Sequence, residues 1–393
     1  MAAFDADSHP NKVSLITGAY RDEEGQPWVL PSVRQAKDRL AGSDHEYLSI
    51  TGSPTLIDLA KSLTFGSDIT NRLWSNIASL QTVSGTGANH LAAAFLSKHL
   101  QPKRVFIPDP SWVNHKTVWA TAGPAVTQHE YPYYSPSTQS VDIEAMLSFL
   151  DTTAEPNDVL ILQACAHNPT GTDLTKWQWI ELGKLVKEKE LFPVFDSAYQ
   201  GFATGDVDAD AWAIRYFTEQ MLTDADSRLP GVCVAQSFSK NFGLYGERVG
   251  ALHLVVPPGL SAAGAKSRLT LMARAEYSSP VKFGASIVET LLGDPELKAQ
   301  WERDLITMSS RIKTMRSRLR GKLQEYVACG DWSFIERQIG MFCYTGMSPD
   351  QVSRLQEEYH VYLMPSGRLS ICGLTEGNVD YVARAIRDVV GLG

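Results

Sequence analysis

The segment VCVAQSFSKNFGLYGERVGALHLVV occupies residues 232–256 and holds two apolar runs on either side of a polar stretch that contains glycine. Each run is almost continuously apolar, which is typical of a strand that is covered on both faces of its sheet. Comparable runs, separated by helical patterns, begin at Val105, Val159 and Pro193. This alternation between about residues 75 and 260 predicts an α/β fold with a mostly parallel sheet covered by helices.

The length of 393 residues suits a large domain with a smaller one attached. From about Glu296 to Leu323, charged residues and leucines recur at helical spacing, which predicts one long helix with a charged face. Beyond it, short strands and two helical patterns indicate a smaller α+β unit that packs with the N-terminal segment. We therefore predict a large domain over residues 25–307 and a small domain over residues 1–24 and 308–393.

Composition argues against several classes of protein. The net charge is −8, from 44 acidic and 36 basic side chains without a basic run, so nucleic acid is not an expected partner. No apolar run approaches the length of a membrane span, and the acidic first residues do not resemble a transit peptide. The five cysteines lack a CxxC pair, which argues against disulfides and metal binding and favours a cytoplasmic location; they are Cys165, Cys233, Cys329, Cys343 and Cys372.

The segments that follow the predicted strands carry polar and aromatic residues. In open parallel sheets, ligands bind outside the carboxyl ends of the strands, so these positions are the expected place for chemistry. The segments are PDPSW at 108–112, AHNPTG at 166–171, DSAY at 196–199 and SFSK at 237–240.

The sequence SGTGAN at residues 84–89 follows an apolar stretch and opens the helical pattern from His90 to Leu100. Free backbone N–H groups and the positive end of a helix can bind an anion there. The segment is therefore a candidate phosphate site, although a small-residue turn before a helix is more often a simple cap.

Lys240 comes just after a predicted buried strand and has Ser237, Ser239 and Asn241 as neighbours. An amine that is partly removed from water can have a lowered pKa and can attack a carbonyl to form a Schiff base. Taken alone, a solvated surface lysine is the more common explanation.

Asp196 ends another predicted buried strand, where a carboxylate needs a cationic or hydrogen-bonding partner. A protonated pyridine nitrogen is one such partner. A helix cap for the residues from Ser197 onward is an equally good interpretation of this aspartate on its own.

A phosphate site, a lysine and an aspartate are together the groups that hold the phosphate, aldehyde and ring nitrogen of pyridoxal phosphate. Three longer segments also resemble signature blocks of the aspartate aminotransferase family. They are ACAHNPTG at 164–171, DSAYQGFA at 196–203 and QSFSKNFGLYGERVG at 236–250. The resemblance extends from Lys12 to the C-terminus and identifies a member of the class I pyridoxal-phosphate-dependent aminotransferases of fold type I.

The resemblance implies a seven-stranded sheet, a homodimer with shared active sites, and pyridoxal phosphate as the cofactor. Lys240, Asp196 and Tyr199 are the implied catalytic residues. The implied cofactor-binding residues are these three together with Ser84, Gly85, Thr86, Trp112, Asn168, Ser237 and Arg248, and Tyr47 from the partner subunit. The implied substrate-binding residues are Gly18, Trp112, Asn168, Arg274 and Arg368, of which Arg274 serves the neighbouring site.

Without the surrounding blocks, both arginines read as ordinary exposed residues and Trp112 as core packing. The resemblance also implies cis peptide bonds before Pro110 and Pro169. No metal site is expected.

The chain departs from the family pattern at Ile16-Thr17, at Gln163, which replaces a histidine behind the aspartate, and at Ser279, which replaces an asparagine. The longer N-terminal arm of the family is expected to be missing ahead of Lys12.

The resemblance implies transfer of an amino group between aspartate or glutamate and a 2-oxo acid, 2-oxoglutarate or oxaloacetate, by a ping-pong mechanism. The departures leave open a shifted substrate, such as an aromatic amino acid, or elimination or substitution at Cβ. A third alternative is a paralogue that keeps the fold without catalysis.

Overall fold

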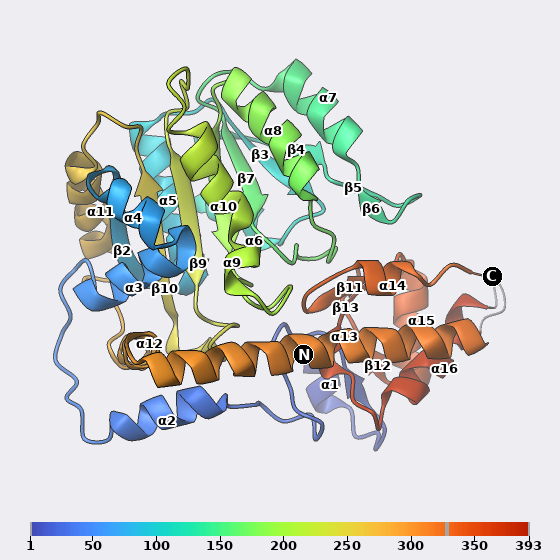
Figure 1. Cartoon of the computed structure of the whole chain (residues 1–393). Coiled ribbons are helices and arrows are strands. Elements are labelled where there is room, and N and C mark those ends of the chain that lie inside the picture. Colours follow the sequence, from blue (N-terminus) through green and yellow to red (C-terminus); the bar gives the residue numbers. More distant parts are fainter. Residues whose placement is uncertain (1, 327–329, 392–393) are drawn as a thin grey trace.

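The computed structural model describes residues 2–326 and 330–391 (Figure 1). Its central element is a seven-stranded sheet in the order β2-β10-β9-β8-β7-β3-β4. All neighbouring strands are parallel except β10, which is antiparallel to both β2 and β9. The strands are β2 (Ile77–Val83), β3 (Arg104–Asp109), β4 (Thr127–Pro132), β7 (Val159–Gln163), β8 (Phe192–Ser197), β9 (Val232–Ser237) and β10 (Val249–Val255). The predicted mostly parallel sheet is thus confirmed.

Successive apolar residues of β3, β7, β8 and β9 contribute to two hydrophobic clusters, one on each face of the sheet. In β3, Val105 and Ile107 join one cluster and Phe106 joins the other. The first face is covered by α5 (Ser84–His99), α6 (Asn114–Ala122) and α11 (Ala263–Glu276). The second is covered by α3 (Pro54–Phe65), α4 (Ser67–Arg72), α7 (Ile143–Thr153), α8 (Lys176–Glu188) and α10 (Trp212–Tyr216). Burial on both faces explains why β3, β7, β8 and β9 are mostly apolar, whereas the edge strand β4 is mostly polar and partly exposed.

The C-terminal unit is built on the long helix α13 (Pro295–Tyr326), which confirms the helix predicted there. Strand β1 (Val13–Ser14) pairs in parallel with β12 (Val361–Tyr362), so the N-terminal segment does pack with this unit. A second pair joins β11 (Phe342–Tyr344) to β13 (Arg368–Ser370). Because α13 passes through residue 307 without interruption, the division at residues 25 and 307 stays a prediction.

The remaining elements connect or flank these units. Helix α2 (Pro31–Arg39) packs against α13, and the N–H of Ser32 donates to Asp304 on α13 at 3.0 Å. The other helices are α1 (Ala2–Ala6), α9 (Val207–Asp210), α12 (Phe283–Gly293), α14 (Phe334–Arg337), α15 (Pro349–Tyr359) and α16 (Val379–Val390). Short helical turns lie at Trp74–Asn76, Phe217–Met221, Tyr245–Glu247 and Ile371–Gly373, and a small hairpin pairs β5 (Tyr134–Ser135) with β6 (Ser140–Val141).

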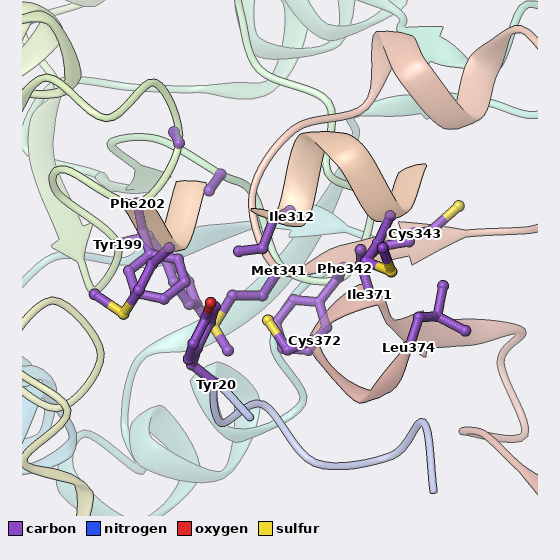
Figure 2. Packing of buried hydrophobic residues seen from close by; sticks show 14 of the residues in the cluster. Tyr20, Tyr199, Phe202, Ile312, Met341, Phe342, Cys343, Ile371, Cys372 and Leu374 are labelled. Carbon is purple, nitrogen blue, oxygen red and sulfur yellow. The ribbon is translucent and has the colours of Figure 1, made fainter. Parts of the chain in front are cut away.

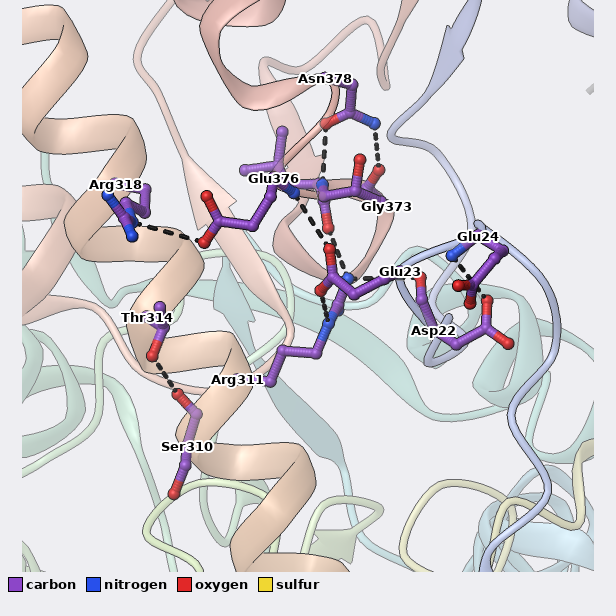
Figure 3. A network of polar contacts seen from close by, with 12 residues as sticks. Asp22, Glu23, Glu24, Ser310, Arg311, Thr314, Arg318, Gly373, Glu376 and Asn378 are labelled. Atoms are coloured by element: carbon purple, nitrogen blue, oxygen red, sulfur yellow. Dashed lines mark hydrogen bonds and ion pairs between the residues drawn. The ribbon is translucent and has the colours of Figure 1, made fainter.

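Arg311 on α13 links the N-terminal segment to the C-terminal unit by an ion pair and a hydrogen bond (Figure 3). Its Nε lies 2.5 Å from a carboxylate oxygen of Glu23, and its Nη2 donates to the carbonyl of Leu374 at 2.8 Å. The second carboxylate oxygen of Glu23 accepts from the N–H of Glu376 at 3.1 Å. One arginine therefore joins three segments that are far apart in the chain.

A buried hydrophobic cluster continues from the loop after β8 into the C-terminal unit (Figure 2). Tyr199 and Phe202 come from that loop, Ile312 from α13 and Phe342 from β11. The ring of Tyr199 makes an edge contact with that of Phe342 at 6.2 Å between centroids. This packing brings β11 and its neighbour β13 to the carboxyl edge of the large sheet.

Four of the five cysteines are buried free thiols, namely Cys165, Cys233, Cys343 and Cys372, while Cys329 lies outside the described residues. Within residues 2–326 and 330–391, no helix is long and apolar enough to cross a membrane. The same residues hold no group of three or more His, Cys, Asp or Glu side chains placed to bind a metal ion.

Candidate active site

The residues predicted for the cofactor and the substrate converge on one cavity of about 250 Å³. It lies at the carboxyl edge of β7, β8 and β9, where parallel-sheet proteins bind their ligands. Its lining includes Gly18, Ser84, Gly85, Thr86, Trp112, Asn168, Asp196, Tyr199, Ser237, Lys240, Arg248 and Arg368. It also includes Asn89 of the SGTGAN segment, and residues to which the sequence analysis gave no role in the site: Gln163, Ala198, Ser239, Tyr245 and Phe342.

The segment SGTGAN forms the first turns of a helix, because α5 begins at Ser84 and not at His90. The hydroxyl of Ser84 lies 3.3 Å from that of Ser237 and 2.9 Å from that of Ser239. Arg248 Nη1 donates to the Ser239 hydroxyl at 3.5 Å. A Cβ at Gly85 would lie 2.9 Å from Cβ of Ser237, so only glycine allows this close approach. Hydroxyls, a guanidinium and the positive end of a helix together form an anion cradle.

Asp196 lies near the end of β8 and is 8% exposed. The helix-cap interpretation is wrong, because the next helix, α9, begins only at Val207. His115 Nε2 lies 3.0 Å from Oδ2 of Asp196, and its Nδ1 lies 2.8 Å from the Ser111 hydroxyl. Sequence reasoning missed His115, although it follows the PDPSW segment by three residues. The aspartate thus has a histidine partner even though Gln163 replaces the family's histidine.

Lys240 follows β9 and reaches the same cavity, which excludes the surface-lysine interpretation. Burial lowers the pKa of its amine, the positive charges of Arg248 and Arg368 lower it further, and Asp196 opposes them. Its Nζ lies 5.2 Å from the centroid of the Tyr199 ring. A lowered pKa increases the fraction of neutral, nucleophilic amine at a given pH.

Tyr199 and Asn168 lie beside this lysine. Burial raises the pKa of the Tyr199 hydroxyl, and its hydrogen bond with the Asn168 side chain lowers it slightly. The Asn168 Oδ1 also accepts from Arg368 Nη1 at 3.2 Å. Asn168 therefore contacts both the tyrosine and the arginine of the cavity.

Arg368 on β13 is held in place from three sides. Its Nη2 donates to the carbonyl of Ile16 at 2.7 Å, and its guanidinium carbon lies 4.1 Å from the centroid of the Phe342 ring. Its Nε is buried without a hydrogen-bond partner among the described residues. Gly18 packs closely against the Phe342 ring in the same cavity. A Cβ at this position would lie 2.8 Å from that ring, which is too close for a larger residue. An oriented guanidinium with a free donor suits a carboxylate ligand.

Comparison with known proteins agrees with this geometry. The family model of class I and II aminotransferases matches residues 10–386. The chain belongs to this aminotransferase family. It is 45% identical to the L-tyrosine:2-oxoglutarate aminotransferase of Aspergillus ustus, over 98% of this chain and 74% of that protein. It is 43% identical to the cytoplasmic aspartate aminotransferase of Saccharomyces cerevisiae, over 98% of this chain and 92% of that protein.

Solved structures give the same result for this aminotransferase. The cytoplasmic enzyme of Saccharomyces cerevisiae superposes with a TM-score of 0.95 at 42% identity, covering 100% of this chain and 95% of that one. An aromatic-amino-acid aminotransferase of Burkholderia pseudomallei, covalently bound to pyridoxal phosphate, superposes with a TM-score of 0.92 at 39% identity, covering 99% and 95%. The aminotransferase therefore has fold type I, and its cofactor is pyridoxal phosphate.

The cavity fits this cofactor. The cradle at the start of α5 offers hydroxyl and guanidinium donors to a phosphate, and the glycine at residue 85 keeps the space open. The carboxylate of Asp196 can accept a hydrogen bond from a ring N–H, and the amine of Lys240 lies in the same cavity. Both X-Pro bonds expected to be cis, Asp109-Pro110 and Asn168-Pro169, are cis.

A single chain of the aminotransferase does not bring Tyr47 and Arg274 to this cavity. Tyr47 is 86% exposed, and Arg274 is exposed on α11. The hydroxyl of Ser279 donates to the carbonyl of Leu48 at 2.9 Å, and Lys282 pairs with Asp44. The segment that carries Tyr47 is thereby fixed to the residues that follow α11.

Proposed function

We propose that this aminotransferase moves an amino group between a dicarboxylic amino acid, aspartate or glutamate, and a 2-oxo acid such as 2-oxoglutarate or oxaloacetate. The observation that carries the proposal is a pair of arginines: the guanidinium of Arg368 is oriented in the cavity that contains Lys240, and Arg274 is exposed on α11, where it is available to a second carboxylate in a partner's site. A bidentate arginine is well suited to an amino-acid carboxylate. The name of the Saccharomyces cerevisiae relative, a cytoplasmic aspartate aminotransferase, supports the same substrate class.

The residues of the cavity have three tasks, which are to move a proton, to hold the cofactor ring and to orient the substrate. When bound, pyridoxal phosphate supplies an electron-withdrawing ring that accepts the charge left when the Cα–H bond of the substrate breaks. Lys240 moves the proton at Cα, since its lowered pKa makes the neutral amine available as a base. Asp196, oriented by His115, holds the ring N–H, while Tyr199 and Asn168 bind the phenolic oxygen. Arg368 orients the α-carboxylate.

An aromatic substrate is the second candidate. The Aspergillus ustus relative acts on L-tyrosine, and the aromatic side chains of Trp112 and Phe342 line the cavity. Elimination or substitution at Cβ begins with the same breakage at Cα, so it stays an alternative outcome. The interpretation as a paralogue without catalysis loses its support, because family membership and the placement of Lys240 and Asp196 both indicate an aminotransferase.

A panel of amino acids tests the proposal. We expect aspartate and glutamate to convert the bound cofactor in a single half reaction, followed by its visible absorbance, and 2-oxoglutarate to reverse the change. Phenylalanine and tyrosine should react with lower kcat/KM. If only the aromatic amino acids react, the second candidate replaces the first, and formation of ammonia with a 2-oxo acid would indicate elimination.

We also propose a homodimer with active sites at the interface. In support, Tyr47 and Arg274 project from the surface, and the segments that carry them are tied together by Ser279 and Lys282. In this arrangement each Arg274 completes the partner's site.

Mixed dimers provide the test of shared sites. We expect Arg274→Ala and Lys240→Ala chains, each strongly impaired toward aspartate as homodimers, to regain activity when refolded together, because each heterodimer has one site with both residues intact. Differently tagged chains isolate the heterodimer. A purified heterodimer without activity would contradict the shared site.

The cytoplasmic location is also a proposal. The free cysteines suit a reducing compartment, and one relative is cytoplasmic, although others are mitochondrial. Cell fractionation with an antibody against the native chain distinguishes the two compartments.

A further inference from the structure

Gln163 is the last residue of β7, is 7% exposed, and lines the cavity. Its side-chain amide binds the backbone of Asn168 at two points. The carbonyl Oε1 accepts from the N–H of Asn168 at 2.8 Å, and Nε2 donates to the carbonyl of Asn168 at 2.9 Å. Among the described residues, no other hydrogen bond to the backbone of Asn168 is present.

We propose that Gln163 is a positioning residue that sets the orientation of Asn168 and, through it, of Arg368 and Tyr199. A primary amide presents a donor and an acceptor side by side, as a peptide group does. Among side chains that stay uncharged at every pH, only glutamine and asparagine carry a donor and an acceptor on neighbouring atoms, and asparagine is shorter by one methylene. A side chain without it leaves the N–H and C=O of a buried residue unpaired, which destabilises the observed turn.

Gln163 affects the cavity through Asn168. Asn168 Oδ1 accepts from Arg368 Nη1 at 3.2 Å, and the same side chain hydrogen-bonds the Tyr199 hydroxyl. If Asn168 turns, Arg368 keeps only the Ile16 carbonyl as a hydrogen-bond partner, and Tyr199 loses its amide partner. Because Gln163 itself contacts neither, its effect on both is indirect. The part of this inference that concerns substrate rests on the proposed role of Arg368.

The first test replaces Gln163 by methionine, which has a similar length and no amide. Gln236→Met is the matched control, since Gln236 is also a buried glutamine of the large sheet but contacts His253. Succinate, an unreactive dicarboxylate, serves as the ligand, and calorimetry with the holoenzyme measures its Kd. We expect Gln163→Met to weaken succinate binding by about tenfold or more, since small misplacements of a binding group have large effects. KM for aspartate should rise more than kcat falls.

The visible absorbance of the holoenzyme provides a readout that does not depend on the substrate. The amide of Asn168 favours the deprotonated phenolic oxygen of the cofactor, so the pH midpoint of the absorbance change should rise by roughly half a unit to one unit in Gln163→Met. Gln236→Met should keep the midpoint and the Kd of the unsubstituted enzyme. Equal values in the two variants would overturn the inference.

Gln163→Glu tests the requirement for a paired donor and acceptor. A protonated carboxyl offers both groups, whereas a carboxylate offers only acceptors. Burial beside Asp196, its register partner on β8, should raise the pKa of the new carboxyl. We expect succinate affinity near that of the unsubstituted enzyme at low pH, and a selective loss as pH rises through this pKa. Affinity as weak as that of Gln163→Met at every pH would refute the donor-acceptor requirement.

The two proposals can fail separately. If the unsubstituted enzyme binds no succinate and gives no half reaction with aspartate, the dicarboxylate function is wrong. The shift of the absorbance midpoint in Gln163→Met still decides whether Gln163 positions Asn168.

Discussion

Replacing Lys240 by alanine is expected to reduce transamination by at least about 10⁴-fold, the upper range for loss of a general base. In the proposed function the amine has two tasks, because it attaches the cofactor and moves the proton at Cα of the substrate. Its position in the cavity and its lowered pKa suit both tasks. Single-turnover kinetics with aspartate, followed by the visible absorbance, measure the loss.

Lys298→Ala, at an exposed position of α13, is the matched control and should keep full activity. Borohydride reduction of the unsubstituted holoenzyme should leave the cofactor covalently attached to the peptide that contains Lys240. A label on another lysine, or Lys240→Ala with activity near that of the control, would refute the assignment.

Replacing Arg274 by alanine is expected to lower kcat/KM for aspartate by about a hundredfold, which corresponds to about 3 kcal/mol. The distal carboxylate enters a closed site, where it needs a charged hydrogen-bond partner. In the proposed dimer this partner is Arg274 of the neighbouring subunit. A neutral or aromatic amino acid lacks that carboxylate, so its kcat/KM should change far less.

Arg268→Ala provides the control for Arg274, since Arg268 is also exposed on α11 but lies six residues earlier. The ratio of kcat/KM for aspartate to that for phenylalanine should fall only in the Arg274 variant. Equal losses for both substrates would assign Arg274 to folding or assembly. We further expect the unsubstituted enzyme to discriminate less strongly between dicarboxylic and other amino acids than the family pattern implies. The reason is that Ser279 is smaller than the usual asparagine and donates its hydroxyl to the carbonyl of Leu48.

The large sheet and most of the cavity could be predicted because both depend on local sequence. Strands covered on both faces must be apolar at almost every position, so β3, β7, β8 and β9 are visible as continuous runs. The carboxyl ends of parallel strands meet at one edge, so the residues that follow these runs come together. Lys240 and Asp196 could therefore be placed in one site before the structure was known.

Contacts between distant segments depended on tertiary packing. His115 meets Asp196, and the Ile16 carbonyl meets Arg368, across separations of 81 and 352 residues. No local periodicity records which of several polar side chains completes such a pair, because the partner is determined by how helices and loops pack on the sheet. The role proposed for Gln163 could not be inferred from the sequence either, since its two hydrogen bonds to the backbone of Asn168 require the folded turn after β7.

The sequence by itself thus determined the α/β class, the long helix and the chemical groups proposed to hold the cofactor, because hydrophobic periodicity and the motif residues are local properties. Only the tertiary structure decided how those groups are oriented, with His115 beside Asp196, Phe342 against Arg368 and Gln163 holding Asn168. The physical reason is that orientation arises from packing and hydrogen bonds between elements whose relative positions exist only after the chain has folded.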